Sequence, residues 1–92
     1  MNPRFTDHLD RMRAIHDAKS HDYATVDDPF SNFKLAADVA GVSTDTVFAT
    51  LIGVKLARLR ELLAGKEPKH ESIDDSLLDL SVYAALWAAS RR

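Results

Sequence analysis

Three carboxylate side chains in the last third of the chain follow one another at four-residue intervals. They are Glu71, Asp75 and Asp79, and residues four apart in a helix lie on one face, one turn from each other. Carboxylates placed in this way suit Mg²⁺ or Mn²⁺, hard cations that prefer oxygen ligands and also bind substrate phosphates. We therefore predict a metal site formed by Asp75 and Asp79, with Glu71 as a further ligand.

The same acids have a structural alternative. Asp79 has apolar neighbours on both sides in the sequence, where an unpaired charge is costly, so it is also expected to pair with Lys55 or Arg58. Asp74 and Asp75 would then complement the positive N-terminal end of a helix. Lys55 and Arg58 interrupt an otherwise apolar stretch, and they either neutralise these acids or bind a phosphate.

A second group of polar and aromatic residues lies in the first third of the chain. Lys19, Asp22 and Tyr23 belong to a segment rich in turn-forming residues, and Asn32 follows it. Tyr23 is suited to stacking on a base and Asn32 to hydrogen-bonding with a base edge, so these four residues form a candidate nucleoside-binding site. The alternative is that Tyr23 and the nearby Phe30 and Phe33 only fill the core.

Composition excludes or disfavours several kinds of site. The 92 residues contain no cysteine, which excludes disulfides, thiolate zinc ligands and a thiol nucleophile. The G-x-S-x-G motif of serine hydrolases is missing, and the four histidines lack the spacing of a helical zinc motif. The formal charge of −2 argues against general binding to a nucleic-acid backbone.

The segment 35–51 resembles the helix-turn-helix of bacterial repressors, in which small residues let two helices cross closely. The side chains that would face the bases include no arginine or lysine, which argues against DNA binding and leaves a tight helix corner as the other interpretation. These positions are Thr44, Asp45, Phe48 and Ala49.

The elements that must position all these groups are helical. Apolar residues recur at three- and four-residue intervals, and glycine and proline are few. Short connections between the periodic segments favour antiparallel neighbours. The pattern predicts one all-α domain over residues 1–92, a compact four-helix bundle-like fold with helices at about residues 6–19, 29–40, 44–64 and 72–90.

The predicted helix ends carry residues with the appropriate local chemistry. Short polar side chains accept hydrogen bonds from free amides at N termini, and glycine adopts the left-handed conformation that ends a helix. Gly53, inside the third helix, predicts close packing against another helix. The expected caps are Asp28 with Pro29, Ser43 and Ser72 at N termini, and Gly41 and Gly65 at C termini.

The last two predicted helices are apolar on more than one side. One stripe of residues 72–90, which by itself would satisfy the core of a monomer, consists of Ile73, Leu77, Leu80, Ala84 and Trp87. Other apolar residues occupy the opposite side, and a helix that is apolar nearly all round is usually buried all round. We therefore predict a homo-oligomer, with a dimer as the simplest case.

The sequence also predicts the cellular location of the protein. No stretch approaches the roughly 20 apolar residues of a membrane helix, and the N-terminal residues lack the apolar core of a signal peptide. We expect a cytoplasmic protein with no membrane partner.

Four segments, taken in order, resemble a family of small phage proteins known as nucleotide-modification-associated domains. The resemblance extends over residues 19–87 and implies a function in nucleotide metabolism in the cytoplasm of a host cell. The segments are Lys19-x-x-Asp22-Tyr23, Asp28-Pro-Phe-x-Asn32-Phe33, Lys55-x-x-Arg58-Leu59 and Glu71-Ser-x-x-Asp75-x-x-x-Asp79-Leu80-x-x-Tyr83.

That family is in turn similar to the all-α nucleoside triphosphate pyrophosphatases (MazG-like), helical oligomers that bind Mg²⁺ between carboxylate-bearing helices. Glu71-Ser-Ile-Asp74 resembles their E-x-x-D motif. Their second motif, E-E-x-x-E, has no counterpart here, and Glu61 stands alone in its helix. A second subunit would have to contribute the missing ligands.

These observations lead to two functional hypotheses. The first is a phage-type nucleotide-binding helical oligomer with Mg²⁺-dependent hydrolysis of nucleoside phosphates as its candidate activity. The alternative, favoured by the missing acidic motif, is a non-catalytic binding protein that sequesters a nucleotide signal or contacts a host protein.

Overall fold

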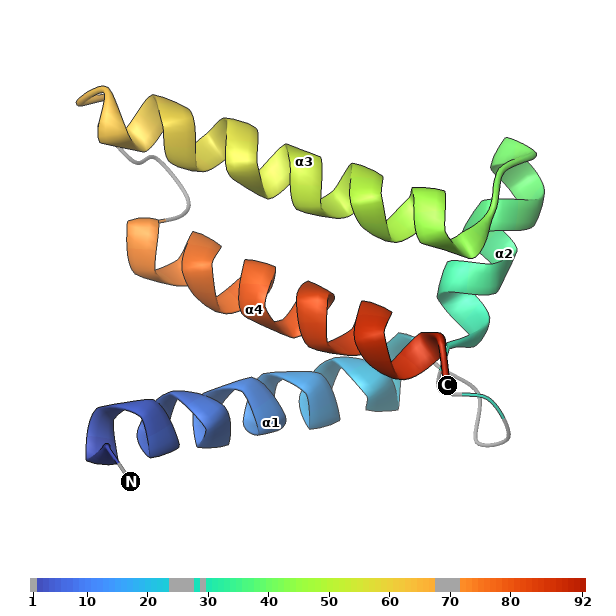
Figure 1. Cartoon of the computed structure of the whole chain (residues 1–92), viewed down its shortest axis with the longest axis horizontal. Helices are drawn as coiled ribbons and strands as arrows, with labels where there is room; N and C mark the ends of the chain where they lie inside the picture. Colours follow the sequence, from blue (N-terminus) through green and yellow to red (C-terminus); the bar gives the residue numbers. More distant parts are fainter. Residues whose placement is uncertain (1, 24–27, 29, 68–71) are drawn as a thin grey trace. The chain divides into compact units, whose positions relative to one another are not determined.

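The computed structural model describes residues 2–23, 28, 30–67 and 72–92, and the side chains of residues 19–23 are not among those described. Within these ranges all regular structure is α-helical, which confirms the predicted all-α class (Figure 1). The helices are α1 (Pro3–Tyr23), α2 (Ser31–Ala40), α3 (Thr44–Leu63) and α4 (Ile73–Ser90).

The chain divides into two compact units, Met1–Val47 and Phe48–Arg92. The boundary falls near the start of α3, so that most of this helix belongs to the second unit together with α4. The prediction of a single domain over residues 1–92 stays a prediction.

Helix α1 is longer than the predicted helix at both ends. At its start, the Asn2 side-chain oxygen accepts a hydrogen bond from the Arg4 amide at 2.8 Å, and the Asn2 carbonyl accepts one from the Thr6 amide at 3.1 Å. Asn2 followed by a proline is thus a helix start, because proline has no amide to leave unpaired. At the other end the helix continues to Tyr23, since no glycine or proline interrupts it.

Helix α2 starts two residues later than predicted, at Ser31. Asp28 still organises this start: its carboxylate accepts a hydrogen bond from the Phe30 amide at 2.9 Å, and its carbonyl accepts one from the Ser31 amide at 3.2 Å. The aspartate therefore forms a turn that leads into the helix, whereas the prediction placed it at the cap itself.

An ion pair at this turn makes the stability of the protein depend on pH. Lys34 Nζ lies 2.6 Å from Asp28 Oδ2, and this hydrogen bond, with that from the Phe30 amide, lowers the pKa of Asp28 below its usual 3.8. Because the pKa of Asp28 is lower in the folded protein than in the unfolded chain, the ion pair stabilises the fold fully above pH 3.8. This stabilisation is lost as the pH falls through the pKa of the folded state.

We predict that Asp28→Asn, which keeps an acceptor for the Phe30 amide, is less stable than the wild type at neutral pH. The difference should shrink as the pH falls below 3.8. Thermal unfolding followed by circular dichroism between neutral and strongly acidic pH measures it. A difference that is constant with pH would mean that the charge of Asp28 contributes nothing.

The other predicted caps are confirmed. The Ser43 hydroxyl accepts a hydrogen bond from the Thr46 amide at 3.1 Å, at the start of α3. Gly41 ends α2 with φ of 70°, and Gly65 follows α3 with φ of 97°, the left-handed conformation in which a side chain is strained. These glycines explain where both helices end.

The prediction that Gly53 marks close helix packing is wrong. Gly53 is exposed on α3, and a Cβ atom built there would have no neighbour within 4 Å. No adjacent backbone therefore requires a glycine at this position. Its remaining effect is to weaken the helix, because glycine loses more backbone entropy on folding than alanine does.

Gly53→Ala is accordingly expected to stabilise the protein by about 0.5–1 kcal/mol. Gly41→Ala is the matched control: space is free there too, but its positive φ should make the same substitution destabilising. Urea unfolding of both variants measures these changes. A destabilising Gly53→Ala would show that this face of α3 is covered in solution.

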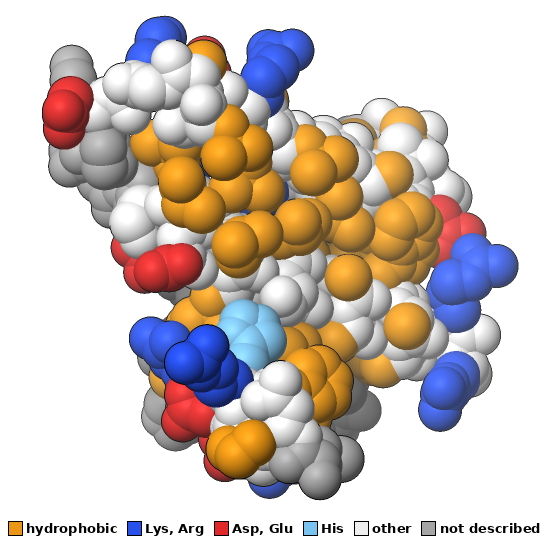
Figure 2. Space-filling view, turned by 60° about the vertical axis from the view of Figure 1, so that its left-hand side comes forward, with side chains coloured by type: hydrophobic (Ala, Val, Ile, Leu, Met, Phe, Trp, Pro, Cys, Tyr) orange, Lys and Arg blue, Asp and Glu red, His pale blue; other side chains and the backbone are white. Residues whose placement is uncertain are grey.

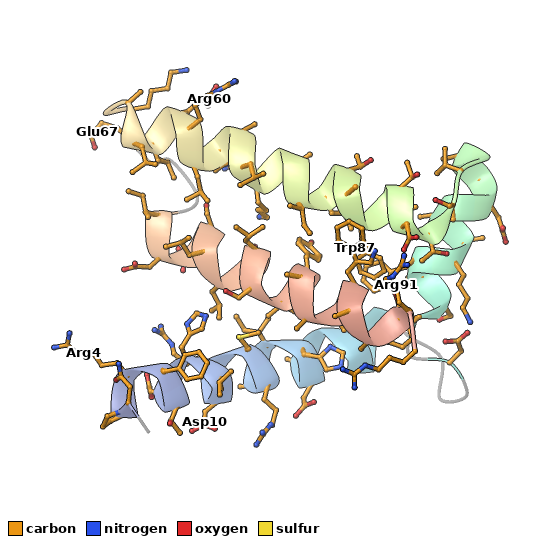
Figure 3. All side chains as sticks on the ribbon, viewed as in Figure 1. Arg4, Asp10, Arg60, Glu67, Trp87 and Arg91 are labelled. Carbon is orange, nitrogen blue, oxygen red and sulfur yellow. The ribbon has the colours of Figure 1, made fainter. Side chains whose placement is uncertain are left out.

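In the second unit, α3 and α4 run antiparallel (Figure 1). Phe48 is fully buried, and its ring stacks on that of Trp87 with centroids 6.3 Å apart and planes 7° from parallel. Trp87 lies between the two helices (Figure 3). Leu59 of α3 and Val82 of α4 are also buried.

No single helix among the described residues has the length and apolar character needed to span a membrane, whereas α2 and α3 taken together as a bent pair meet that criterion.

Candidate functional site

Lys55 of α3 and Asp79 of α4 form an ion pair within the second unit. Lys55 Nζ lies 2.8 Å from Asp79 Oδ2, and the two side chains are only 16% and 21% exposed. This is the structural alternative foreseen for Asp79. In the structure, the cation predicted to hold a phosphate and the acid predicted to hold a metal neutralise each other.

Asp75 caps the N terminus of α4. Its carboxylate accepts a hydrogen bond from the Ser72 amide at 3.2 Å, and the Ser72 hydroxyl accepts one from the Asp75 amide at 3.1 Å. This reciprocal capping box satisfies two amides that the helix itself leaves free. Asp75 therefore has a local role that needs no metal ion.

Ser76 is buried beside this cap, and its hydroxyl has no hydrogen-bond partner among the described residues. A hydroxyl without accessible surface cannot contact a ligand from solvent. Among the described residues Ser76 is thus a buried hydroxyl whose desolvation no hydrogen bond offsets.

The metal hypothesis gains no support from the described residues. Glu71 lies outside them, and within them no three His, Cys, Asp or Glu side chains come close enough together to hold a metal ion. Arg58, the second predicted phosphate ligand, is exposed on α3. The predicted Mg²⁺ or Mn²⁺ site stays a prediction.

The candidate nucleoside-binding residues are described only in part. The side chains of Lys19, Asp22 and Tyr23 lie outside the described ones, although α1 continues to Tyr23, where the residues after Lys19 were expected to form a loop. Asn32 is exposed in the first turn of α2. Base recognition by these residues also stays a prediction.

Phe48 bears on the helix-turn-helix hypothesis. It was one of the four residues expected to face DNA bases, but its side chain is fully buried against Trp87. This part of α3 therefore faces the core of its own unit, which adds to the argument against DNA binding.

Apolar side chains of α4 that were predicted to be buried are exposed. The stripe of α4 that was expected to form the core is largely exposed: Ile73 is 38% and Leu77 44% accessible, Ala84 is exposed, and only Leu80 and Trp87 are partly buried. The buried Val82 belongs to the opposite stripe. Both stripes are apolar, so amphipathicity did not indicate which one faces inward.

Exposed leucines of α3 lie on the same side of the helix pair. Because Lys55 and Asp79 form an ion pair, they lie on the sides of α3 and α4 that face each other. The residue after each of them, Leu56 in α3 and Leu80 in α4, is rotated by about 100° about its own helix axis. Because the helices are antiparallel, these rotations bring Leu56 and Leu80 to one side of the pair. Leu63 shares this side, since it lies seven residues after Leu56.

We call this surface the outer apolar face. Leu56 is 53% and Leu63 74% exposed, and hydrophobic side chains gather over these helices in Figure 2. The outer apolar face comprises Leu56 and Leu63 of α3 with Ile73, Leu77, Leu80 and Ala84 of α4.

Comparison of the chain with protein-family models, with curated proteins and with solved structures gave no match. The resemblance to the phage family therefore rests on the sequence motifs alone.

Proposed function

We propose that this chain is a non-catalytic binding protein that docks another helical polypeptide on the outer apolar face. The observation that carries this proposal is the group of exposed large side chains on one side of α3 and α4, among them Leu56, Leu63 and Leu77. Single exposed apolar residues are common, whereas a contiguous patch on a small protein marks an interaction site.

The charged residues of the second unit favour binding over catalysis. Lys55 and Asp79 satisfy each other, and Asp75 is engaged in the helix cap. A metal-dependent hydrolase needs carboxylates that are open to the metal and the substrate. These side chains instead stabilise the helix pair that presents the outer apolar face.

The face has the form that helix docking requires. Two antiparallel helices with leucine and isoleucine along one side present apolar ridges against which a third helix can pack its own apolar side chains. The predicted contact with a host protein is one such interaction.

Site-specific photocrosslinking in the producing cells tests this function. The probe is a benzophenone amino acid at position 56, on the outer apolar face, and the control is the same amino acid at position 54. Val54 and Leu56 are similarly exposed, at 56% and 53%. They are two residues apart on one helix and therefore point to nearly opposite sides. We expect a discrete crosslinked polypeptide, identified by mass spectrometry, from position 56 only. Equal crosslinking from both positions, or none, would contradict the proposal.

A further inference from the structure

The ion pair between Lys55 and Asp79, we infer, determines which of the two apolar sides of α4 faces α3. It is a conformational device built into the fold, because it excludes the packing in which α4 is rotated and its other apolar side turns inward. The inference concerns the folded form of the chain itself. It does not depend on whether the outer apolar face binds a partner.

The two sides of α4 offer similar apolar side chains to α3. In the structure Val82 is buried, whereas Ile73 and Leu77 are exposed. Helix interfaces accept different apolar side chains when the total volume is similar, so apolar packing alone distinguishes the two orientations poorly. The two sides carry Leu78, Val82 and Leu86 on one and Ile73, Leu77 and Leu80 on the other.

Charged residues are so sparse on the two helices that the pair defines a single alignment. Lys55 is the only charged residue between positions 46 and 57, and Asp79 is the only one between positions 76 and 90. Asp75, one turn before Asp79, is engaged in the capping box with Ser72. A shift of α4 by one turn therefore brings no other available carboxylate to Lys55.

Rotation of α4 breaks the pair in either direction. The neighbours of Asp79 in the sequence are Leu78 and Leu80, and successive residues are about 100° apart around a helix. Either rotation therefore places a leucine opposite Lys55. The two side chains of the pair are only 16% and 21% exposed, and a largely buried charge that loses its partner is strongly destabilising. The rotated packings are excluded for this reason, in the way that a polar residue fixes the alignment of a coiled coil.

Nuclear magnetic resonance of the double variant Lys55→Met with Asp79→Leu tests the inference. The wild type should give one proton–nitrogen cross-peak for each backbone amide. The double variant should keep its far-ultraviolet circular dichroism but show additional or broadened peaks from α3 and α4, because both orientations become populated. It should also lose the near-ultraviolet signal of Trp87, whose ring stacks on Phe48. A single set of peaks with an undiminished Trp87 signal would overturn the inference.

Two matched variants show whether the effect belongs to the pair. Lys55→Asp with Asp79→Lys restores an ion pair with the charges exchanged and should recover a single set of peaks. Arg60→Met with Asp74→Leu also removes one cation from α3 and one anion from α4, but both side chains are exposed, so the single set should remain. Several sets of peaks from either variant would mean that the pair does not select the orientation.

Moving the carboxylate by one residue gives a second, independent test. Asp79→Leu with Leu80→Asp has the same composition as the wild type, and its carboxylate meets Lys55 only if α4 turns by about 100°. We expect nuclear Overhauser contacts between the Leu77 methyl groups and α3, and loss of those of Val82. Retention of the Val82 contacts would overturn the inference. Unfolding of both this variant and Lys55→Met with Asp79→Leu would also overturn it, because the pair would then be needed for folding in any orientation.

Discussion

Replacing Phe48 with alanine is expected to lower the free energy of unfolding by about 3–5 kcal/mol, the range for removing a buried phenyl ring. Phe48 is fully buried, and its ring stacks on Trp87 with a centroid distance of 6.3 Å. Alanine would leave a cavity and remove the aromatic contact together. Because a domain of this size has only about 5–15 kcal/mol of stability, the variant should be close to unfolding at physiological temperature.

Urea unfolding followed by far-ultraviolet circular dichroism measures this loss. Tryptophan fluorescence is a poor probe here, since Trp87 is the only tryptophan and its surroundings change with the substitution. Val39→Ala is the control, because Val39 is 81% exposed and its replacement should change stability by about 0.5 kcal/mol or less. A comparably small loss for Phe48→Ala would show that the aromatic pair is not part of the core.

Replacing Asp79 with alanine is expected to cost about 1–3 kcal/mol, between the values for exposed and for fully buried ion pairs. Lys55 and Asp79 are 16% and 21% exposed, so water screens the pair only in part. The substitution removes the carboxylate that lies 2.8 Å from the Lys55 ammonium group. Most of the loss is the cost of keeping that cation in an environment poor in water.

The double variant Lys55→Met with Asp79→Leu distinguishes the interaction between the two charges from the cost of desolvating them. Two apolar side chains of similar size should restore the stability to within about 1 kcal/mol of the wild type, because the desolvation of both charges is avoided. Urea unfolding of the two single variants and the double variant completes a double-mutant cycle. Independent, additive losses would mean that the two groups do not interact in solution.

A separate measurement on Asp79 tests the predicted metal chemistry. Mg²⁺ or Mn²⁺ at Asp79 would compete with Lys55 for the carboxylate. A metal-dependent rise of the unfolding temperature with a nucleotide, in the wild type but not in Asp79→Asn, would support the nucleotide hypothesis. A ligand at 100 times its dissociation constant stabilises by about 2.7 kcal/mol, which is readily measured in a domain this small.

Local chemistry explains why much of the secondary structure could be predicted. The caps at Ser43 and Ser72 and the left-handed glycines Gly41 and Gly65 involve residues only a few positions apart. Their hydrogen bonds form in any context in which the helix forms. The start of α1 was predicted too late for a related reason: Asn2 with its following proline has the same chemistry as Asp28 with Pro29 but was not interpreted in that way.

The amino-acid sequence by itself therefore determined the all-α class, most helix ends and the presence of apolar residues on both sides of α4. Tertiary structure decided which of these sides is buried: Val82 faces inward, while Ile73 and Leu77 remain exposed. It also decided that Lys55 is the partner of Asp79. The physical reason is that both decisions depend on how α3 and α4 pack together, and the periodicity of a single helix contains no information on its neighbour.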